Sequence, residues 1–227
     1  MTGGDNLPVR LASSLVLAPL ALAAAWVGGT VFVVFWAGAA LIIGFEWIKL
    51  VAPARSLMSW RIAGVIYAAI AFIAPVLLRA DVNNGFAALV FLFAIVWMTD
   101  IMGYAIGRAV GGPKLWQVVS PNKTRSGAIG GVAGALAAGI VIAASLSLAV
   151  LPIAILSVIL SMVAQAGDLL ESAIKRRFGA KDTGHLIPGH GGLMDRLDGF
   201  IAAASVAAII GIARGGLSVA ATGLLVW

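Results

Sequence analysis

Long apolar runs recur along almost the whole chain and limit what it can fold into. They lie near residues 9–27, 30–50, 60–79, 85–106, 126–148, 151–174 and 199–225. A helix of about 20 apolar residues crosses the hydrocarbon core of a bilayer, whereas strand-like alternation is absent here. The runs therefore predict an all-α, polytopic integral membrane protein with about seven transmembrane helices. Arg214, Gly215 and Gly216 interrupt the last run, which can also be interpreted as one span followed by a surface tail.

The composition agrees with a membrane protein and narrows its chemistry. Hydrophobic residues make up 62% of the chain and charged residues 11%, whereas soluble domains are about 25% charged. The chain has no cysteine, which excludes disulfides, zinc-thiolate sites and thiol nucleophiles. Any metal ion would therefore be bound by oxygen or imidazole. The start, MTGGDNLPVR, leads into a long apolar run without a small-residue cleavage site, so we expect the first span to be retained.

The basic residues gather on one side of the predicted bundle. If successive spans alternate in direction, the side of the N-terminus holds all 15 Lys and Arg residues except Arg79 and Arg214. The positive-inside rule makes this side cytoplasmic. The two longest polar connections, 107–125 and 175–198, also fall on it. This asymmetry favours a protein that meets a cytoplasmic solute at the membrane surface over a structural anchor.

Pairs of carboxylates occur where two predicted spans reach that side. Asp168 and Glu171 lie on one helix face with Lys175, and Asp195 and Asp198 have the same spacing at the start of the last span. Carboxylates within a membrane are costly and tend to be functional. Mg²⁺ prefers carboxylate oxygens together with phosphate and water. The four carboxylates therefore predict a metal site. The alternatives are a salt-bridged helix end, and a proton relay, which would place its carboxylates in mid-span.

Two glycine-containing segments on this side are suited to phosphate. In PGHGG, residues 188–192, three glycines let backbone N–H groups approach an anion before a helix start. SPNKT, residues 120–124, precedes a second glycine-rich helix start but lacks the GxxxxGK[ST] spacing of a Walker loop. We expect SPNKT to be a loop that contacts phosphate or ribose, with a solvated connection as the alternative. His185 and His190 have no HExxH context, so zinc is not expected.

Small residues dominate GAIGGVAGALAAG, from Gly127 to Gly139. Small residues four apart let membrane helices approach closely. This segment predicts close helix packing.

One long gapped pattern resembles a known family. It reads S-x-x-K-R, four residues, K-D-x-G, two residues and I-P-G-H-G-G-x-x-D-R-x-D, and runs from Ser172 to Asp198. This order is similar to the signature of the phosphatidate cytidylyltransferases, also called CDP-diacylglycerol synthases. Upstream, Asp100 with Gly103 and Tyr104, Gly107 with Arg108, and SPNKT agree with it. The resemblance covers roughly the C-terminal 130 residues.

The resemblance divides the single membrane domain into two parts. Residues 81–227 would be the catalytic region, whereas residues 1–80 match only in hydropathy and at Glu46. Two departures stand out. Gly199 occupies the place of a family serine, and the chain is shorter than most members, as if one or two early spans were missing.

The resemblance implies a reaction between CTP and phosphatidate that gives CDP-diacylglycerol and pyrophosphate in the bacterial inner membrane, with the active-site loops in the cytoplasm. It implies Mg²⁺, with a second, monovalent cation as an option. Both substrates are anions, so positioning and charge neutralisation are the main tasks of the protein. The expected partners are these substrates and membrane lipids. A homodimer is compatible with the resemblance, and no nucleic acid is expected.

The hypothesis assigns roles to residues of this chain. Asp168 and Asp195 would hold the metal at the α-phosphate, with Glu171 and Asp198 as further ligands. The residues expected to act in catalysis are Asp168, Lys181, Asp195 and Arg196. Those expected to contact the nucleotide or its phosphates are Ser120, Lys123, Thr124, Lys181, His190, Gly191, Gly192 and Arg196. Arg108, Lys175 and Arg176 would attract the lipid headgroup, and Asp100 and Asp182 are further motif residues.

Two other functions stay open at this point. A CTP-dependent polyprenol- or phytol-type lipid kinase would release CDP instead of pyrophosphate. A small cation-coupled membrane transporter would carry charges through mid-membrane, whereas these carboxylates gather at one rim.

Overall fold

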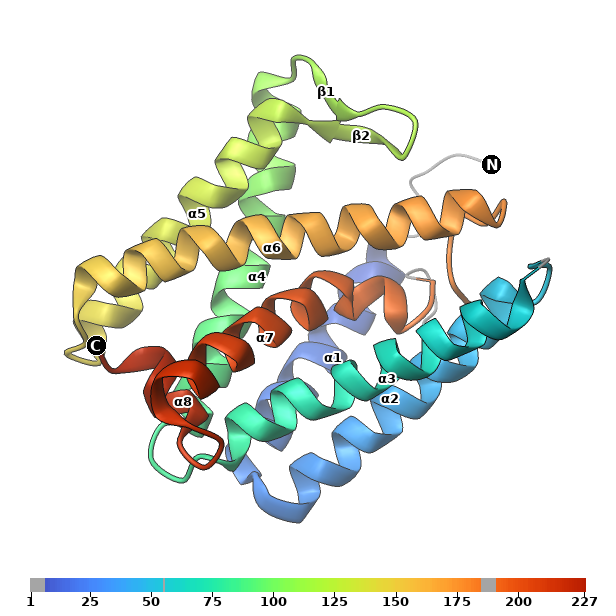
Figure 1. The fold of residues 1–227 in the computed structure, drawn as a ribbon. Coiled ribbons are helices and arrows are strands. Elements are labelled where there is room, and N and C mark those ends of the chain that lie inside the picture. Colours follow the sequence, from blue (N-terminus) through green and yellow to red (C-terminus); the bar gives the residue numbers. More distant parts are fainter. Residues whose placement is uncertain (1–6, 55, 185–190) are drawn as a thin grey trace.

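The computed structural model describes residues 7–54, 56–184 and 191–227, with side chains from residue 16 onward. These ranges form helices α1 to α8 and one short hairpin, β1 and β2 (Figure 1). The elements are α1 (Leu7–Val27), α2 (Gly29–Val51), α3 (Leu57–Ala80), α4 (Gly85–Val110), β1 (Lys114–Trp116), β2 (Ser120–Thr124), α5 (Arg125–Ser145), α6 (Val150–Arg177), α7 (Met194–Gly215) and α8 (Ala220–Leu225). The predicted all-α class is confirmed.

The helices have the length that membrane crossing requires. Within the described ranges, six helices, α2 to α7, are long and apolar enough to span a bilayer. The apolar part of α1 from Val16 to Val27 is shorter than these six helices. The prediction of a polytopic protein with about seven spans agrees with this count. The break at Arg214, Gly215 and Gly216 that the sequence allowed in the run 199–225 is present, because α7 ends at Gly215 and Gly216 adopts a φ of 84° that turns the chain into α8. Helix α8 is mostly buried, so it is not the surface tail that was the alternative.

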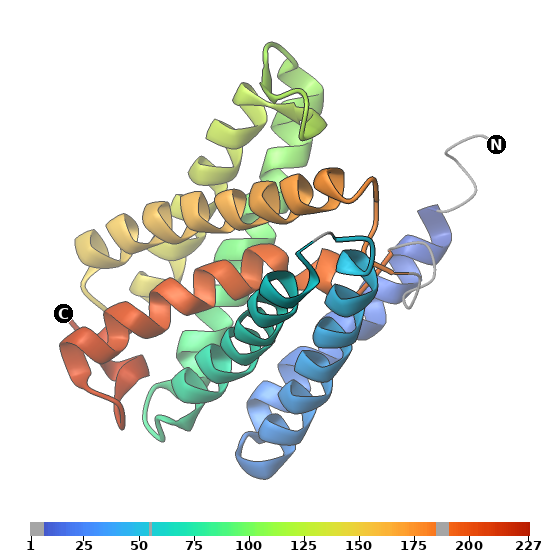
Figure 2. The same cartoon turned by 45° about the vertical axis from the view of Figure 1, so that its right-hand side comes forward.

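The helices pack as neighbouring antiparallel pairs. Helix α2 pairs with α3, α4 with α5 and α6 with α7, while α5 also packs on α6 and α3 on α7. In Figure 2, α7 lies between α6 and α3, with α2 and α1 beyond. Helix α7 is therefore covered from several sides along most of its length.

Aromatic rings from three helices form the centre of the bundle. Phe200 of α7 stacks on Trp36 of α2 and on Phe93 of α4, with ring centroids 5.5 Å and 4.8 Å apart. All three side chains are buried. Stacked aromatic pairs contribute about 0.5–1.5 kcal/mol each beyond the area they bury. This stacking anchors the beginning of α7 against α2 and α4.

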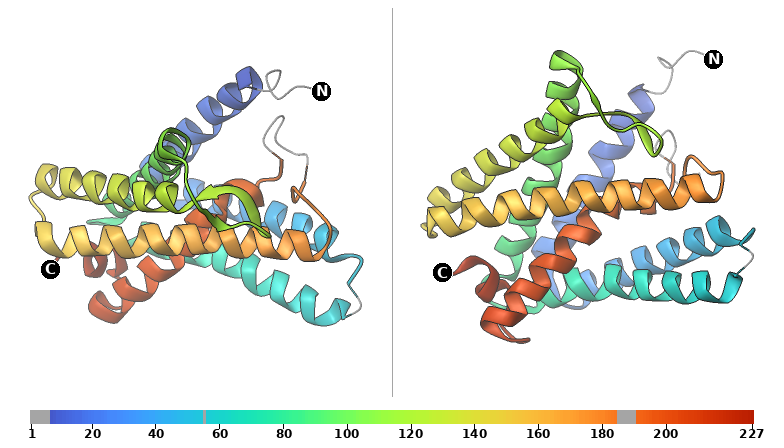
Figure 3. Two further views of the ribbon diagram at one scale, coloured as in Figure 1. Left: turned by 90° about the horizontal axis from the view of Figure 1, so that it is seen from above. Right: turned by 45° about the horizontal axis from the view of Figure 1, so that its top comes forward.

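Helices α4 and α5 approach closely through small residues, as predicted for 127–139. A methyl group on Gly131 would lie 2.7 Å from the carbonyl oxygen of Thr99, and one on Gly127 would lie 2.7 Å from that of Gly103. The hairpin that joins the two helices pairs Lys114 with Thr124 in antiparallel register. SPNKT is therefore strand β2 and not the loop that we expected. Figure 3 shows the hairpin above α6.

A buried carboxylate joins the helix ends on the far side of the bundle. Asp81 follows α3, is 1% exposed, and accepts hydrogen bonds from the backbone N–H groups of Asn83, Asn84 and Thr222 at 3.0, 3.2 and 2.7 Å. Arg79 donates from Nε to the Ala25 carbonyl at the end of α1, 2.5 Å away. Arg214 donates to the carbonyl of Gly223 in α8. Arg79 and Arg214 thus share the end that the sequence predicted for them.

We expect Asp81→Asn to destabilise the protein by about 1–3 kcal/mol, because the new amide group would face an N–H donor. Burial of the Asp81 carboxyl favours its neutral form, but the hydrogen bonds from Thr222, Asn84 and Asn83 outweigh burial and lower its pKa. A lowered pKa contributes stability that is present above the unfolded-state pKa of about 4 and is lost as the pH falls through the folded-state value. The difference in melting temperature between wild type and variant in detergent should therefore be constant near neutrality and shrink in acid. A difference that grows in acid would contradict this account.

Candidate active site

Three carboxylates meet where α6 ends and α7 begins. Asp168 and Glu171 of α6 and Asp198 of α7 each place an oxygen within 4.8 Å of the other two. Glycine allows the approach, because a methyl group on Gly167 would lie 2.5 Å from the Ala202 side chain. Three of the four carboxylates predicted as metal ligands thus come together. We call Asp168, Glu171 and Asp198 the acidic cluster.

The acidic cluster has the chemistry of a site for a hard divalent cation. Glu171 is 3% exposed, and its Oε1 atom has no hydrogen-bond partner among the described residues. Carboxylates this close repel one another unless protons or cations compensate their charge. Mg²⁺ takes carboxylate oxygens and completes its coordination with phosphate oxygens and water. The three residues therefore fit Mg²⁺.

Two lysines compensate part of this negative charge. Lys123 of β2 forms an ion pair with Asp168, which links the hairpin to α6. Lys175 is 8% exposed, and its Nζ atom lies 2.9 Å from Glu171 Oε2 and 2.6 Å from Asp195 Oδ1. Breaking a buried pair leaves an uncompensated charge and is strongly destabilising. Lys175, predicted to attract the lipid headgroup, is instead held inside the protein between two carboxylates.

Asp195, the fourth predicted metal ligand, lies outside the acidic cluster. Its Oδ1 atom accepts from Lys175, and its Oδ2 atom accepts from Thr183 N, Thr183 Oγ1 and Gly192 N at 2.9, 2.9 and 2.8 Å. Asp195 therefore ties both ends of the connection between α6 and α7 to Lys175. The Gly192 N–H group, predicted to contact phosphate, donates to this carboxylate.

Glu46 of α2 reaches the same connection, and it has no role in the hypothesis drawn from the sequence. Its side chain is 4% exposed and accepts hydrogen bonds from the backbone N–H groups of Leu193 and Met194. One signal was available in the sequence. Glu46 is the single acidic residue in the apolar run 30–50, and a carboxylate in such a run is costly unless it has partners.

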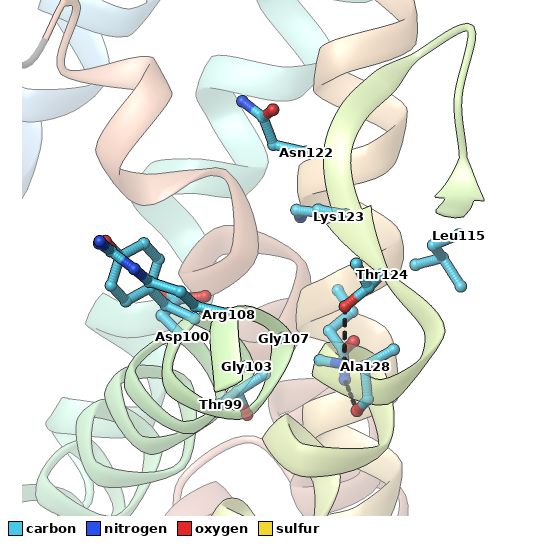
Figure 4. A pocket seen from close by; sticks show the side chains of 13 residues that line it. Thr99, Asp100, Gly103, Gly107, Arg108, Leu115, Asn122, Lys123, Thr124 and Ala128 are labelled. Carbon is cyan, nitrogen blue, oxygen red and sulfur yellow. Dashed lines mark hydrogen bonds between the residues drawn. The ribbon is translucent and has the colours of Figure 1, made fainter. Parts of the chain in front are cut away.

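A pocket of about 440 Å³ lies between α4, the hairpin, α5 and α6 (Figure 4). Its cationic lining residues are Arg108 and Lys123, and Lys123 also contacts the cluster through Asp168. Asp100 lines the pocket together with Gly103 and Gly107 of α4 and Gly127 of α5. An anionic group in this pocket would lie next to Lys123, which also pairs with Asp168 of the acidic cluster.

Arg108 and Thr124 have partners in the wall of the pocket. Arg108 is exposed and donates to the Tyr104 hydroxyl at 2.8 Å. Thr124 is buried and caps α5, because its hydroxyl accepts from Gly127 N at 3.1 Å. The Thr124 hydroxyl thus has a structural role in addition to its predicted phosphate contact.

The remaining predicted residues surround this region. Lys181, Asp182 and Arg196 are exposed, and Ser120 at the start of β2 is half-buried. Arg176 is exposed and donates to the Ala180 carbonyl at 2.8 Å. Gly191 adopts a φ of 85°, in the left-handed region that favours glycine. His185 and His190 lie outside the described residues.

The chain resembles proteins of known name over most of its length. A phosphatidate cytidylyltransferase of Brucella abortus biovar 1 (strain 9-941) is 39% identical over 256 residues, which cover 91% of this chain and 94% of that protein. A phosphatidate cytidylyltransferase of Brucella melitensis biotype 1 is 38% identical over the same shares. One of Staphylococcus saprophyticus is 45% identical over 121 residues, 52% of this chain and 46% of that protein. The Brucella similarity extends well beyond the C-terminal 130 residues.

Residues 57–212 match the model of the cytidylyltransferase family. This range holds the acidic cluster, the hairpin and every residue that lines the pocket beside it. Glu46 lies before it. The chain belongs to the cytidylyltransferase family.

Proposed function

We propose that this protein transfers the cytidylyl group of CTP to phosphatidate, forming CDP-diacylglycerol and pyrophosphate. The Brucella proteins named phosphatidate cytidylyltransferase support this reaction by their likeness over 91% of the chain. The observation that carries the proposal is geometric. The acidic cluster adjoins, through the ion pair of Lys123 and Asp168, a pocket with cationic side chains.

The reaction needs no nucleophile from the protein. An oxygen of the lipid phosphate, ionised at neutral pH, attacks the α-phosphorus of CTP. The bond from that phosphorus to the oxygen leading to the β-phosphate breaks, and pyrophosphate leaves with the electron pair. Because both substrates are anions, the protein contributes mainly by positioning them and neutralising their charge.

The acidic cluster would hold Mg²⁺ in this proposal, with Asp168, Glu171 and Asp198 as ligands. When bound, the ion would neutralise phosphate charge and orient the triphosphate. Lys175 keeps Glu171 in place from the other side. Asp195 would not be a metal ligand in this proposal. Its carboxylate accepts hydrogen bonds from Thr183 N and Gly192 N and so holds the connection before α7.

Cationic side chains would bind the phosphates around this centre. Arg108 and Lys123 line the pocket, where either the nucleotide or the lipid phosphate would meet them. Lys181 and Arg196 are exposed at the same end, where they would approach the departing pyrophosphate. Nearly all basic residues fall on the side of this end in the sequence, and the positive-inside rule supports a cytoplasmic orientation for it. The likeness to bacterial relatives supports the bacterial inner membrane as the location.

The first test is product analysis with the purified protein in detergent. With CTP labelled at the α-phosphate, phosphatidate and Mg²⁺, we expect the label to enter a CDP-lipid and unlabelled pyrophosphate to form. Removing the lipid or chelating the metal with EDTA should stop the reaction, and added Mg²⁺ should restore it. Label recovered as CDP beside a phosphorylated lipid alcohol would identify a kinase and contradict the proposal.

Substitution within the acidic cluster tests the site itself. Asp198→Asn removes one charge and one cation-binding oxygen without changing shape, and we expect turnover to fall by about 100-fold or more, the scale seen when a preorganised electrostatic group is removed. Asp81→Asn is the matched control, because it makes the same change to a buried carboxylate at the far end of the bundle. Measured well below its melting temperature, the control should turn over like wild type. Equal losses in the two variants would refute the assignment.

A further inference from the structure

We propose that Glu46, outside the range that matches the family model, is a positioning residue that sets where the carboxylates at the start of α7 lie. Its two oxygens accept two backbone N–H groups at the start of α7. Oε1 accepts from Leu193 N at 2.9 Å and Oε2 accepts from Met194 N at 2.8 Å, while Thr183 Oγ1 lies 3.4 Å from Oε2. Helix α2 therefore reaches across the fold to the active-site segment.

Helix α7 depends on this contact because its own segment supplies no side-chain cap. The helix begins at Met194, and the preceding residue, Leu193, has an apolar side chain that cannot accept a hydrogen bond. The first N–H groups of a helix have no partner within it, and leaving them unpaired in a buried setting costs free energy. Glu46 supplies both acceptors from another helix, and its negative charge is favourable at a helix N-terminus.

The contact determines the orientation of the functional residues that follow. Asp195 is the second residue of α7, and Asp198 lies less than one turn further on. A rotation or shift at Met194 would carry both carboxylates with it, Asp198 out of the acidic cluster and Asp195 away from Lys175. Glu46 acts through the helix, since none of its hydrogen bonds named above involves the cluster.

Thr183 and Gly192 pack tightly against the Glu46 carboxylate. Thr183 Oγ1 contacts Asp195 at 2.9 Å as well as Glu46, so the two carboxylates hold the connection together. A methyl group on Gly192 would lie 2.7 Å from each Glu46 oxygen and would collide with the Thr183 hydroxyl. Gly192 is therefore required by this packing, independently of any phosphate. Gly192→Ala should disturb the same contact from the other side.

The experiment compares Glu46→Gln with Asp81→Asn. Both convert a buried carboxylate that accepts backbone N–H groups into an amide, one at each end of the bundle. Hydrogen–deuterium exchange of the amides in 193–199 reports on positioning, and kcat per folded protein at saturating CTP and phosphatidate reports on its consequence. We expect Glu46→Gln to speed exchange in 193–199 and to lower kcat by about tenfold, the scale of one lost hydrogen bond. Asp81→Asn should do neither, and Glu46→Asp should recover part of kcat.

The outcomes separate the possible failures. If Glu46→Gln lowers the melting temperature while exchange in 193–199 and kcat match those of Asp81→Asn, Glu46 is merely structural and the proposal is overturned. If Glu46→Gln does not fold, Gly192→Ala takes its place, with the same expected results and the same overturning one. The activity measurement rests on the proposed function, but the exchange measurement does not. A wild type that makes no CDP-lipid would refute the function and still leave the positioning role to be decided by exchange.

Discussion

The rest of the site depends on the buried ion pairs that the Lys175 ammonium group forms with two carboxylates. The ammonium group sits between Glu171 of α6 and Asp195 of α7 with little exposure to solvent. Without it, two carboxylates would face each other in an apolar setting, where an uncompensated charge is very costly. With it, α6 and α7 can bring their polar ends together. The acidic cluster, of which Glu171 is a member, forms beside this ion pair, with Lys123 of the hairpin as its second counter-charge.

At each end of the bundle, a buried carboxylate accepts hydrogen bonds from backbone N–H groups at helix ends. At the site, Glu46 accepts N–H groups at the start of α7, and at the far end Asp81 accepts those of Asn83, Asn84 and Thr222. Helix ends have unpaired backbone groups, and an apolar chain has few side chains that can satisfy them. One buried carboxylate at each end satisfies several at once. At the site, the capped helix is also the helix that carries Asp198.

Much of this organisation could be predicted from sequence periodicity. The apolar runs predicted the helices, and the distribution of Lys and Arg predicted which helix ends share a side. The spacing of Asp168 and Glu171, with Asp198 on the next span, predicted all three members of the acidic cluster, together with Asp195, which lies outside it. These features depend on short-range spacing and on the direction in which each helix runs, both of which the sequence contains.

The contacts that could not be predicted from the sequence depend on which helices pack against each other in the fold. Asp195 was predicted to bind the metal and Lys175 the lipid headgroup, but in the structure the two form an ion pair. Asp195 also accepts a hydrogen bond from the Gly192 N–H group, which was predicted to contact phosphate. Glu46 lies 147 residues before Leu193, and only the packed fold brings them together. A helix N-terminus with glycines is a ready anion site in general. Here the anions nearest to it are side chains of the protein itself.

The central claim is that Asp168, Glu171 and Asp198 form a divalent-cation site next to the pocket between α4, the hairpin, α5 and α6. Anomalous diffraction from crystals grown with Mn²⁺ and CTP would test it most directly, because the Mn²⁺ signal locates the ion without reference to activity. The account predicts a peak within coordination distance of all three carboxylates. A peak at Asp195 instead, or none near the cluster while CTP is visible in the pocket, would contradict it.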